Sequence, residues 1–244
     1  MKRRHQSQGF HARPRGHTPV DGIPTALAHH QAGRLAEAEA GYRAILDAEP
    51  DHPDALHLLG VVTLQRGDSE DAVRMIRRAI AVNPEFADFH GNLGHALWLL
   101  GRFDDADASC RRALALREAY PEAHNNLGNA LWSQRRAGEA AASYARALLL
   151  RPDYVDAMNN LGNALRDLGR HAEAEVYYRQ ALAHAPGYVD AWSNLGVSLR
   201  ALGRTEEAIA CYRRALELAP DFADAWNNMG NALASLDRHE EAIG

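Results

Sequence analysis

Residues 121–154 read PEAHNNLGNALWSQRRAGEAAASYARALLLRPDY, and residues 155–188 read VDAMNNLGNALRDLGRHAEAEVYYRQALAHAPGY. The string NNLGNAL stands at the same place in both stretches, which are 34 residues long and align without a gap. The same spacing continues in both directions, as a column of glycines shows: Gly60, Gly94, Gly128, Gly162, Gly196 and Gly230. A fixed period of this length is the sequence signature of a repeat protein.

Three more columns keep the same register. Alanine fills two of them: Ala38, Ala72, Ala106, Ala140, Ala174, Ala208 and Ala242 in one, and Ala79, Ala113, Ala147, Ala181 and Ala215 in the other. Proline fills the third, with Glu118 in its place once: Pro50, Pro84, Pro152, Pro186 and Pro220. Chance does not hold four columns in register over this many copies, so every unit is expected to fold in the same way.

Each unit is predicted to form two helices. Apolar residues within 123–131 recur at the 3.6-residue spacing of a helix face. A turn follows in which glycine supplies the left-handed backbone, at Gly67, Gly101, Gly169 and Gly203, while Arg135 and Asp237 replace it in two units. Acidic residues at the start of the second helix complement the helix dipole, and the proline column ends that helix.

Large side chains occupy two columns that complement the small ones. The first column contains Tyr42, Ile76, Cys110, Tyr144, Tyr178 and Tyr212, and the second contains Leu56, His90, His124, Met158, Trp192 and Trp226. One helix pair cannot bury its apolar face alone, so neighbouring pairs are expected to stack. The sequence therefore predicts an all-α fold, a right-handed α-solenoid of stacked antiparallel helix pairs.

These columns resemble the tetratricopeptide repeat family, and the resemblance covers about residues 19–244. The predicted organisation is a basic, disordered N-terminal extension, 1–20, and a solenoid, 21–244. Its units lie near 19–52, 53–86, 87–120, 121–154, 155–188, 189–222 and, incomplete, 223–244. The first unit departs from the pattern at Gly22, Ala26 and Ile45. Because the last unit stops early in its second helix, we expect that the natural protein continues or that this chain is a fragment.

The net charge of −5 is unevenly distributed along the chain. Residues 1–20 carry five basic residues and no acidic one, which leaves residues 21–244 with a net charge of −10. An acidic body argues against general nucleic-acid binding. The basic segment is typical of a disordered extension, with contact to nucleic acid or anionic lipid as the alternative. No apolar run suffices for a secretory signal or a membrane span, so the sequence predicts a cytoplasmic protein.

The chain is predicted not to be an enzyme. Its single lysine, Lys2, excludes a Schiff-base or phosphate-loop lysine in the body of the protein. The 13 histidines show no metal-ligand spacing, and His90 and His124 occupy a packing column. Cys110 and Cys211 lie almost three units apart, too far for a disulfide. We therefore expect no catalytic residue, no metal site and no cofactor.

A column of asparagines is the candidate binding site. Its members are Asn92, Asn126, Asn160, Asn194 and Asn228, with Asn129, Asn163 and Asn231 three residues beyond Asn126, Asn160 and Asn228. A carboxamide can bond both the C=O and the N–H of an extended peptide. The family resemblance implies that the first helices line a concave groove, which would make these residues a peptide-binding ladder. The alternative, equally weighted, is that they form structural bonds between helices.

The NNLGNAL runs are also similar to the repeat region of O-linked N-acetylglucosamine transferases and their bacterial relatives. That resemblance implies an arm that presents protein substrates to a transferase domain, here beyond the chain. The leading prediction is a protein–protein interaction module that binds an extended peptide on its concave face. The alternatives are the non-catalytic arm of a glycosyltransferase or sulfotransferase, and a structural adaptor. The oligomeric state stays open, with end-to-end self-association as one arrangement.

Overall fold

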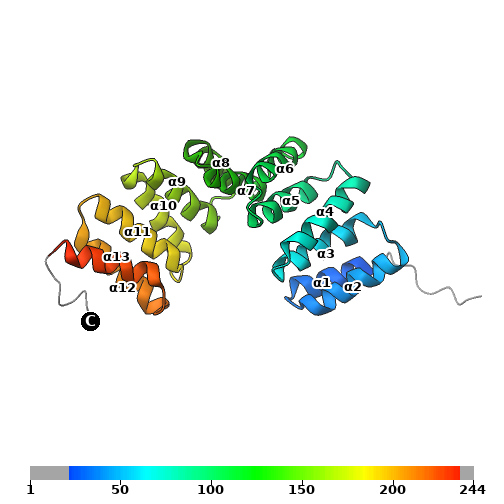
Figure 1. Ribbon diagram of the computed structural model, residues 1–244, viewed down its shortest axis with the longest axis horizontal. Helices are drawn as coiled ribbons and strands as arrows, with labels where there is room; N and C mark the ends of the chain where they lie inside the picture. The colour runs from blue at the N-terminus through cyan, green and yellow to red at the C-terminus, as the bar shows by residue number, and fades with distance from the viewer. Residues whose placement is uncertain (1–21, 237–244) are drawn as a thin grey trace, which may run out of the picture.

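The computed structural model describes residues 22–236, and every regular element in this part of the chain is an α-helix. The helices are α1 (Gly22–Gln31), α2 (Leu35–Ala48), α3 (Pro53–Gln65), α4 (Ser69–Val82), α5 (Ala87–Leu99), α6 (Phe103–Leu116), α7 (Pro121–Ser133), α8 (Ala137–Leu150), α9 (Val155–Asp167), α10 (His171–His184), α11 (Val189–Ala201), α12 (Thr205–Leu218) and α13 (Ala223–Ala234). They follow one another along an arch, with α1–α4 in one arm and α10–α13 in the other (Figure 1).

The turn inside each helix pair requires a left-handed backbone. Glycine provides it in five described turns, with φ between 72° and 90°: Gly33, Gly67, Gly101, Gly169 and Gly203. Arg135 takes this place between α7 and α8 with φ 65°. A residue with a Cβ atom costs about 1–2 kcal/mol in this conformation. The predicted left-handed turns are thus confirmed, and Arg135 adopts the same backbone at some cost.

Within each pair, a glycine of the first helix receives a large side chain of the second. A Cβ atom on Gly128 would lie 2.4 Å from Cε1 of Tyr144, which is only 1% exposed. The same relation joins Gly60 to Ile76, Gly94 to Cys110, Gly162 to Tyr178 and Gly196 to Tyr212. The small and large columns of the sequence therefore form one interlocking contact, repeated along the solenoid.

The second large column combines packing with a hydrogen bond. Its histidine and tryptophan rings donate to the carbonyl oxygen six residues earlier: His90 to Pro84 at 2.8 Å, His124 to Glu118 at 3.0 Å, Trp192 to Pro186 at 2.9 Å and Trp226 to Pro220 at 2.8 Å. The packing prediction is wrong for Trp226, which is 49% exposed. The reason is that no described element packs on α13 beyond α11 and α12.

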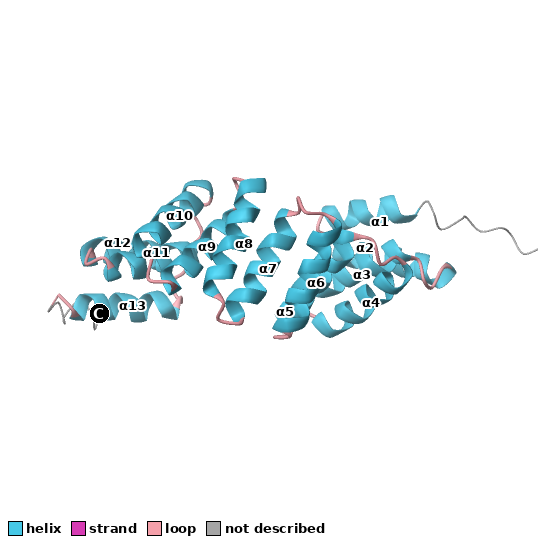
Figure 2. Ribbon diagram, turned by 90° about the horizontal axis from the view of Figure 1, so that it is seen from above, coloured by secondary structure: helices cyan, strands magenta, loops and turns pink. Residues whose placement is uncertain are grey.

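Successive pairs stack unevenly, and this sets the curvature. The backbone of each first helix approaches that of the next first helix, from α1 and α3 to α11 and α13, whereas the backbones of the described second helices stay further apart and meet through long side chains such as Arg179 and Glu207, 3.8 Å apart. Elements on the inside of a curved stack approach each other, so the odd-numbered helices line the concave side. Figure 2 shows the helices side by side with their loops at the edges of the row. The all-α solenoid of helix pairs is confirmed.

Some sequence predictions fall outside the described residues. These are the N-terminal extension, 1–20, the turn at Asp237 and the start of the last second helix at 237–244. Within residues 22–236, none of the helices combines the length and the apolar character that a membrane span requires.

Candidate functional site

One face of each odd-numbered helix is turned toward the neighbouring odd-numbered helices and the concave side, and its edge still reaches the even-numbered partner, as the bond from Tyr144 to Asn129 shows. On α7, helical spacing places residues 122, 125, 126, 129, 132 and 133 on this face. We call these positions, with their equivalents at intervals of 34 residues, the concave surface. All the predicted asparagines belong to it.

The structure bonds part of the asparagine column across neighbouring helices. Asn160 Nδ2 donates to Asn125 Oδ1 and to Asn129 Oδ1, both at 3.2 Å. Asn194 Nδ2 donates to Asn159 Oδ1 at 3.3 Å, and its Oδ1 accepts from Arg166 at 2.9 Å. These bonds join α9 to α7 and α11 to α9. Asn160 and Asn194 therefore form structural bonds between helices, which was the alternative to peptide binding.

Other asparagines keep their hydrogen-bonding capacity. Asn126 Nδ2 donates to Gly91 O at 3.4 Å, while Asn126 Oδ1 has no partner among the described residues. Asn160 Oδ1 also lacks one in that part of the chain, and the same holds for the side chains of Asn228 and Asn231. The Asn92 amide lies 2.7 Å from the His57 ring nitrogen. The column thus divides into amides used within the fold and oxygens still open to a ligand.

The asparagines three residues further on serve the interior of each pair. Tyr144 donates to Asn129 Oδ1 and Tyr178 to Asn163 Oδ1, both at 2.8 Å. Val197 stands at the equivalent place for Tyr212, and the Tyr212 hydroxyl is buried without a hydrogen bond to a described residue. Asn129 and Asn163 are therefore partly structural.

Sequence reasoning missed a second set of bonds at the C-terminal ends of the odd-numbered helices. Trp98 Nε1 donates to Ser133 Oγ at 3.0 Å, and Trp132 Nε1 donates to Asp167 Oδ2 at 2.7 Å. Both pairs are separated by 35 residues, like the asparagine bonds from Asn160 to Asn125. A search for polar pairs one residue beyond the repeat period would have found them.

A row of carboxylates runs along the opposite edge of the concave surface, at the second position of six odd-numbered helices. Its members are Asp54, Asp88, Glu122, Asp156, Asp190 and Asp224. Two of them have arginine partners: Arg117 Nη2 lies 2.6 Å from Asp88, and Arg151 pairs with Glu122. Arg117 also stacks on Tyr120, with its Cζ atom 3.8 Å from the ring centroid.

The C-terminal half of this row lacks the arginines. Ala185 and Ala219 occupy the places that correspond to Arg117 and Arg151. Asp156 accepts only a long hydrogen bond, 3.5 Å, from the Tyr188 hydroxyl. Asp190 and Asp224 have no side-chain partner among the described residues. The carboxylate row is therefore less neutralised toward α13 than toward α5.

Burial holds both cysteines and His57 in a single protonation state at neutral pH. Cys110 and Cys211 are free and buried, and burial raises the pKa of Cys110 to about 12 and that of Cys211 to about 11. Burial lowers the pKa of His57 to about 4, which keeps its ring neutral. Among residues 22–236 no group of three His, Cys, Asp or Glu side chains is arranged to hold a metal ion.

Family comparisons agree with the repeat architecture. Models described as tetratricopeptide repeat match residues 25–73 and 57–124, residues 120–187 and 153–221, and residues 211–244. Together these matches extend over almost the whole solenoid. The transferase-like resemblance has no counterpart among them.

Individual relatives share the fold over different spans. Cellulose synthase operon protein C of Komagataeibacter xylinus is 37% identical over 57 residues, which are 23% of this chain and 4% of that protein. Chains in the structures of the APC/C hetero-tetramer Cut9–Hcn1 and of MamA match with TM-scores of 0.82 and 0.60, at 18% and 25% identity. The Cut9–Hcn1 match covers 88% of this chain and 43% of the matched chain. The MamA match covers 68% of this chain and 96% of the MamA chain. YrrB, a repeat protein with an unusual peptide-binding site, matches at 0.61 and 18% identity, over 76% of this chain and 96% of YrrB.

Proposed function

Because this chain belongs to the tetratricopeptide repeat family, we propose that its concave surface binds an extended segment of a protein partner. The observation that carries this proposal is a pair of open acceptors. Asn126 and Asn160 stand in successive units, and each keeps its carboxamide oxygen without a partner among the described residues. Because these two carboxamide oxygens are separated by one repeat unit, they suit a ligand that carries hydrogen-bond donors at regular intervals.

An extended peptide backbone has a suitable period. Packed helices lie 8–10 Å apart, whereas an extended chain in the polyproline II conformation rises about 3.1 Å per residue with three residues per turn, so that every third N–H faces the same side. Successive carboxamides would therefore meet every third residue of a segment that crosses the odd-numbered helices. A bond from a peptide N–H to Asn126 Oδ1 depends on the backbone and not on the side chain, so this part of the recognition tolerates many sequences.

Charge makes the partner more specific. Asp156, Asp190 and Asp224 lie on the concave surface without an arginine partner. We propose that the bound segment carries lysine or arginine side chains opposite these carboxylates. Binding of this kind weakens as salt screens the charges.

The second candidate function is a substrate-presenting arm of a larger transferase. The feature that favours it is the NNLGNAL run in α7 and α9, which resembles the repeat regions of O-linked N-acetylglucosamine transferases. In this role the concave surface would still bind an extended protein segment, and no catalytic step is assigned to the chain itself. An assay of this chain alone with a nucleotide sugar is expected to show no turnover.

The test separates binding from folding with two matched variants. A peptide array probed with the chain supplies the best extended sequence, which is then titrated by calorimetry. Asn126→Ala removes the open oxygen and is expected to weaken binding by roughly 2- to 13-fold. The same change at Asn194, whose amide is occupied on both sides, is expected to lower stability and leave the affinity of the folded protein nearly unchanged.

Two results would argue against this proposal. One is equal affinity of wild type and Asn126→Ala for every peptide that binds. The other is no loss of affinity when the lysines and arginines of the best peptide are replaced by glutamine.

A further inference from the structure

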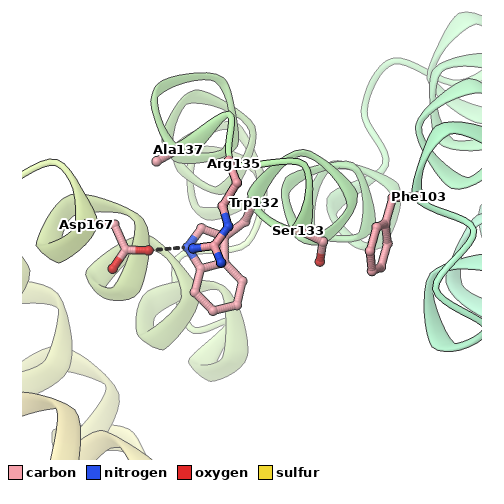
Figure 3. Close-up of a pocket in the computed structure, with 6 residues that line it drawn as sticks. All are labelled: Phe103, Trp132, Ser133, Arg135, Ala137 and Asp167. Carbon is pink, nitrogen blue, oxygen red and sulfur yellow. Dashed lines mark hydrogen bonds between the residues drawn. The ribbon is translucent and has the colours of Figure 1, made fainter.

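A cleft lies on the edge of the solenoid where the turns between first and second helices gather. Its volume is about 640 Å³. It extends over three successive units, from Phe103 at the start of α6, past Trp132 and Arg135, to Asp167 at the end of α9 (Figure 3). It lies at the opposite end of the odd-numbered helices from the carboxylate row.

Arg135 distinguishes this turn from all the other described turns of its kind. Its φ of 65° lies where the equivalent positions carry glycine. In Figure 3 its side chain extends from the turn into the cleft and overlaps the indole of Trp132 in this view. The Arg135 guanidinium forms no hydrogen bond or ion pair with a described residue. An arginine is thus held in a backbone conformation that disfavours it, with five N–H donors unused.

The other polar groups of the cleft also leave donors unmatched. Ser133 Oγ accepts from Trp98, so its own hydroxyl hydrogen is available. The two oxygens of Asp167 accept from Trp132 at 2.7 Å and from Arg166 at 3.3 Å. The Trp132 N–H is committed to this carboxylate, and its half-buried ring lines the cleft. The Arg135 guanidinium and the Ser133 hydroxyl hydrogen are therefore donors without an acceptor among the described residues, in a cleft that the Trp132 ring also lines.

We propose that this cleft binds an acidic side chain of a partner protein segment, with its carboxylate on Arg135 and Ser133. An apolar side chain two residues away packs against Trp132, because alternate residues of an extended chain face the same side. A carboxylate matches the guanidinium fork, and the bonds are charge-assisted. This site lies at the edge of the concave surface formed by the C-terminal ends of α7 and α9, away from the open asparagine oxygens, and it adds an acidic–apolar recognition element to the proposed function.

The experiment titrates the ¹⁵N-labelled chain with the blocked pentapeptide Gly-Phe-Ala-Glu-Gly and follows the indole N–H signal of Trp132. We expect this signal and the amides of residues 133–137 to shift with a millimolar dissociation constant. The peptide with Gln in place of Glu is expected to bind about tenfold more weakly, equivalent to about 1.4 kcal/mol. Arg135→Gly should weaken the Glu peptide by a similar factor while raising the melting temperature, since glycine suits the left-handed turn.

Two controls keep the interpretation specific. Arg77→Gln removes another exposed arginine without a described partner and should leave the titration unchanged. Asn126→Ala on the concave surface should also leave it unchanged, so that failure here is distinguishable from failure of the concave site.

Three outcomes would overturn the assignment. The first is the absence of a Trp132 shift at millimolar Glu peptide. The second is equal binding of the Glu and Gln peptides, or of wild type and Arg135→Gly. The third is binding of a phosphoserine peptide without binding of the Glu peptide, which would assign the cleft to a different anion.

Discussion

The side chain of Asn160 offers the sharpest test of how neighbouring units are held together. Its amide bridges Asn125 and Asn129 on the preceding odd-numbered helix. Asn125 is only 5% exposed, and its Oδ1 accepts no other bond in the described part of the chain. Asn129 Oδ1 keeps a second bond, from Tyr144. Asn160→Ala therefore leaves one buried carbonyl oxygen unsatisfied.

The expected loss follows from two opposing effects. A buried acceptor without its donor costs about 1–3 kcal/mol. Alanine is the better helix former by up to about 0.7 kcal/mol, which offsets part of this cost. We expect Asn160→Ala to lower the free energy of unfolding by about 0.5–2 kcal/mol, measured by urea denaturation and circular dichroism. Hydrogen exchange in α7 and α9 should increase more than in α3, because solenoid units depend on their nearest neighbours.

Asn126→Ala is the matched control for this loss. The same substitution one unit earlier removes only a 3.4 Å bond to a helix carbonyl, so it should leave stability unchanged or slightly higher. A double-mutant cycle between Asn160→Ala and Asn125→Ala should show coupling, since the two residues share one bond. The reasoning would be refuted if Asn160→Ala and Asn126→Ala lowered the free energy of unfolding equally and the effects of Asn160→Ala and Asn125→Ala were additive.

Two further predictions concern the interior of the solenoid. Gly128→Ala places a Cβ atom 2.4 Å from the Tyr144 ring, so we expect it to destabilise the protein by about 1–3 kcal/mol in thermal unfolding. If steric overlap is the cause, the loss of stability should be smaller in a Tyr144→Ala background. An equal loss in that background would exclude overlap as the cause. The folded pKa of His57, about 4, lies below its usual value of 6.5, so the associated stability is complete above pH 6.5 and is lost as the pH falls toward 4. This loss should reach about 2 kcal/mol at pH 5 in urea unfolding, and His57→Gln should reduce the pH dependence; an unchanged pH dependence in that variant would contradict the assignment.

The fold could be predicted from the sequence because residue size carries the information. Gly128 and Tyr144 are 16 residues apart, and the same separation joins Gly196 to Tyr212. A small residue and a large one at a fixed spacing define a contact, whatever the rest of the unit contains. Trp226 marks the limit of this argument, because its exposure depends on what packs beyond α13 and not on its own unit.

The candidate site could be predicted only as a column of residues. Asn126 and Asn160 belong to the same NNLGNAL string, yet Asn126 meets the backbone of Gly91 and Asn160 meets the side chain of Asn125. The difference comes from the preceding unit, at a position one residue out of register with the asparagine column. Two units can therefore carry the same NNLGNAL string while their asparagines bond differently. For this reason the sequence of a single unit could not show which amides bond within the fold and which keep a free oxygen.

It follows that binding capacity in this solenoid belongs to pairs of adjacent units. The carboxylate row adds a second variation, which arises within single units: Arg117 neutralises Asp88 from the far end of the same unit, whereas Ala185 leaves Asp156 without a cation. The same helix position therefore presents a neutralised carboxylate on α5 and a carboxylate without an arginine partner on α11. A partner segment that binds along the whole groove must change its chemistry from one end to the other. Exchanging residues 185 and 219 for arginine should transfer the neutralised character to the C-terminal half without altering the fold.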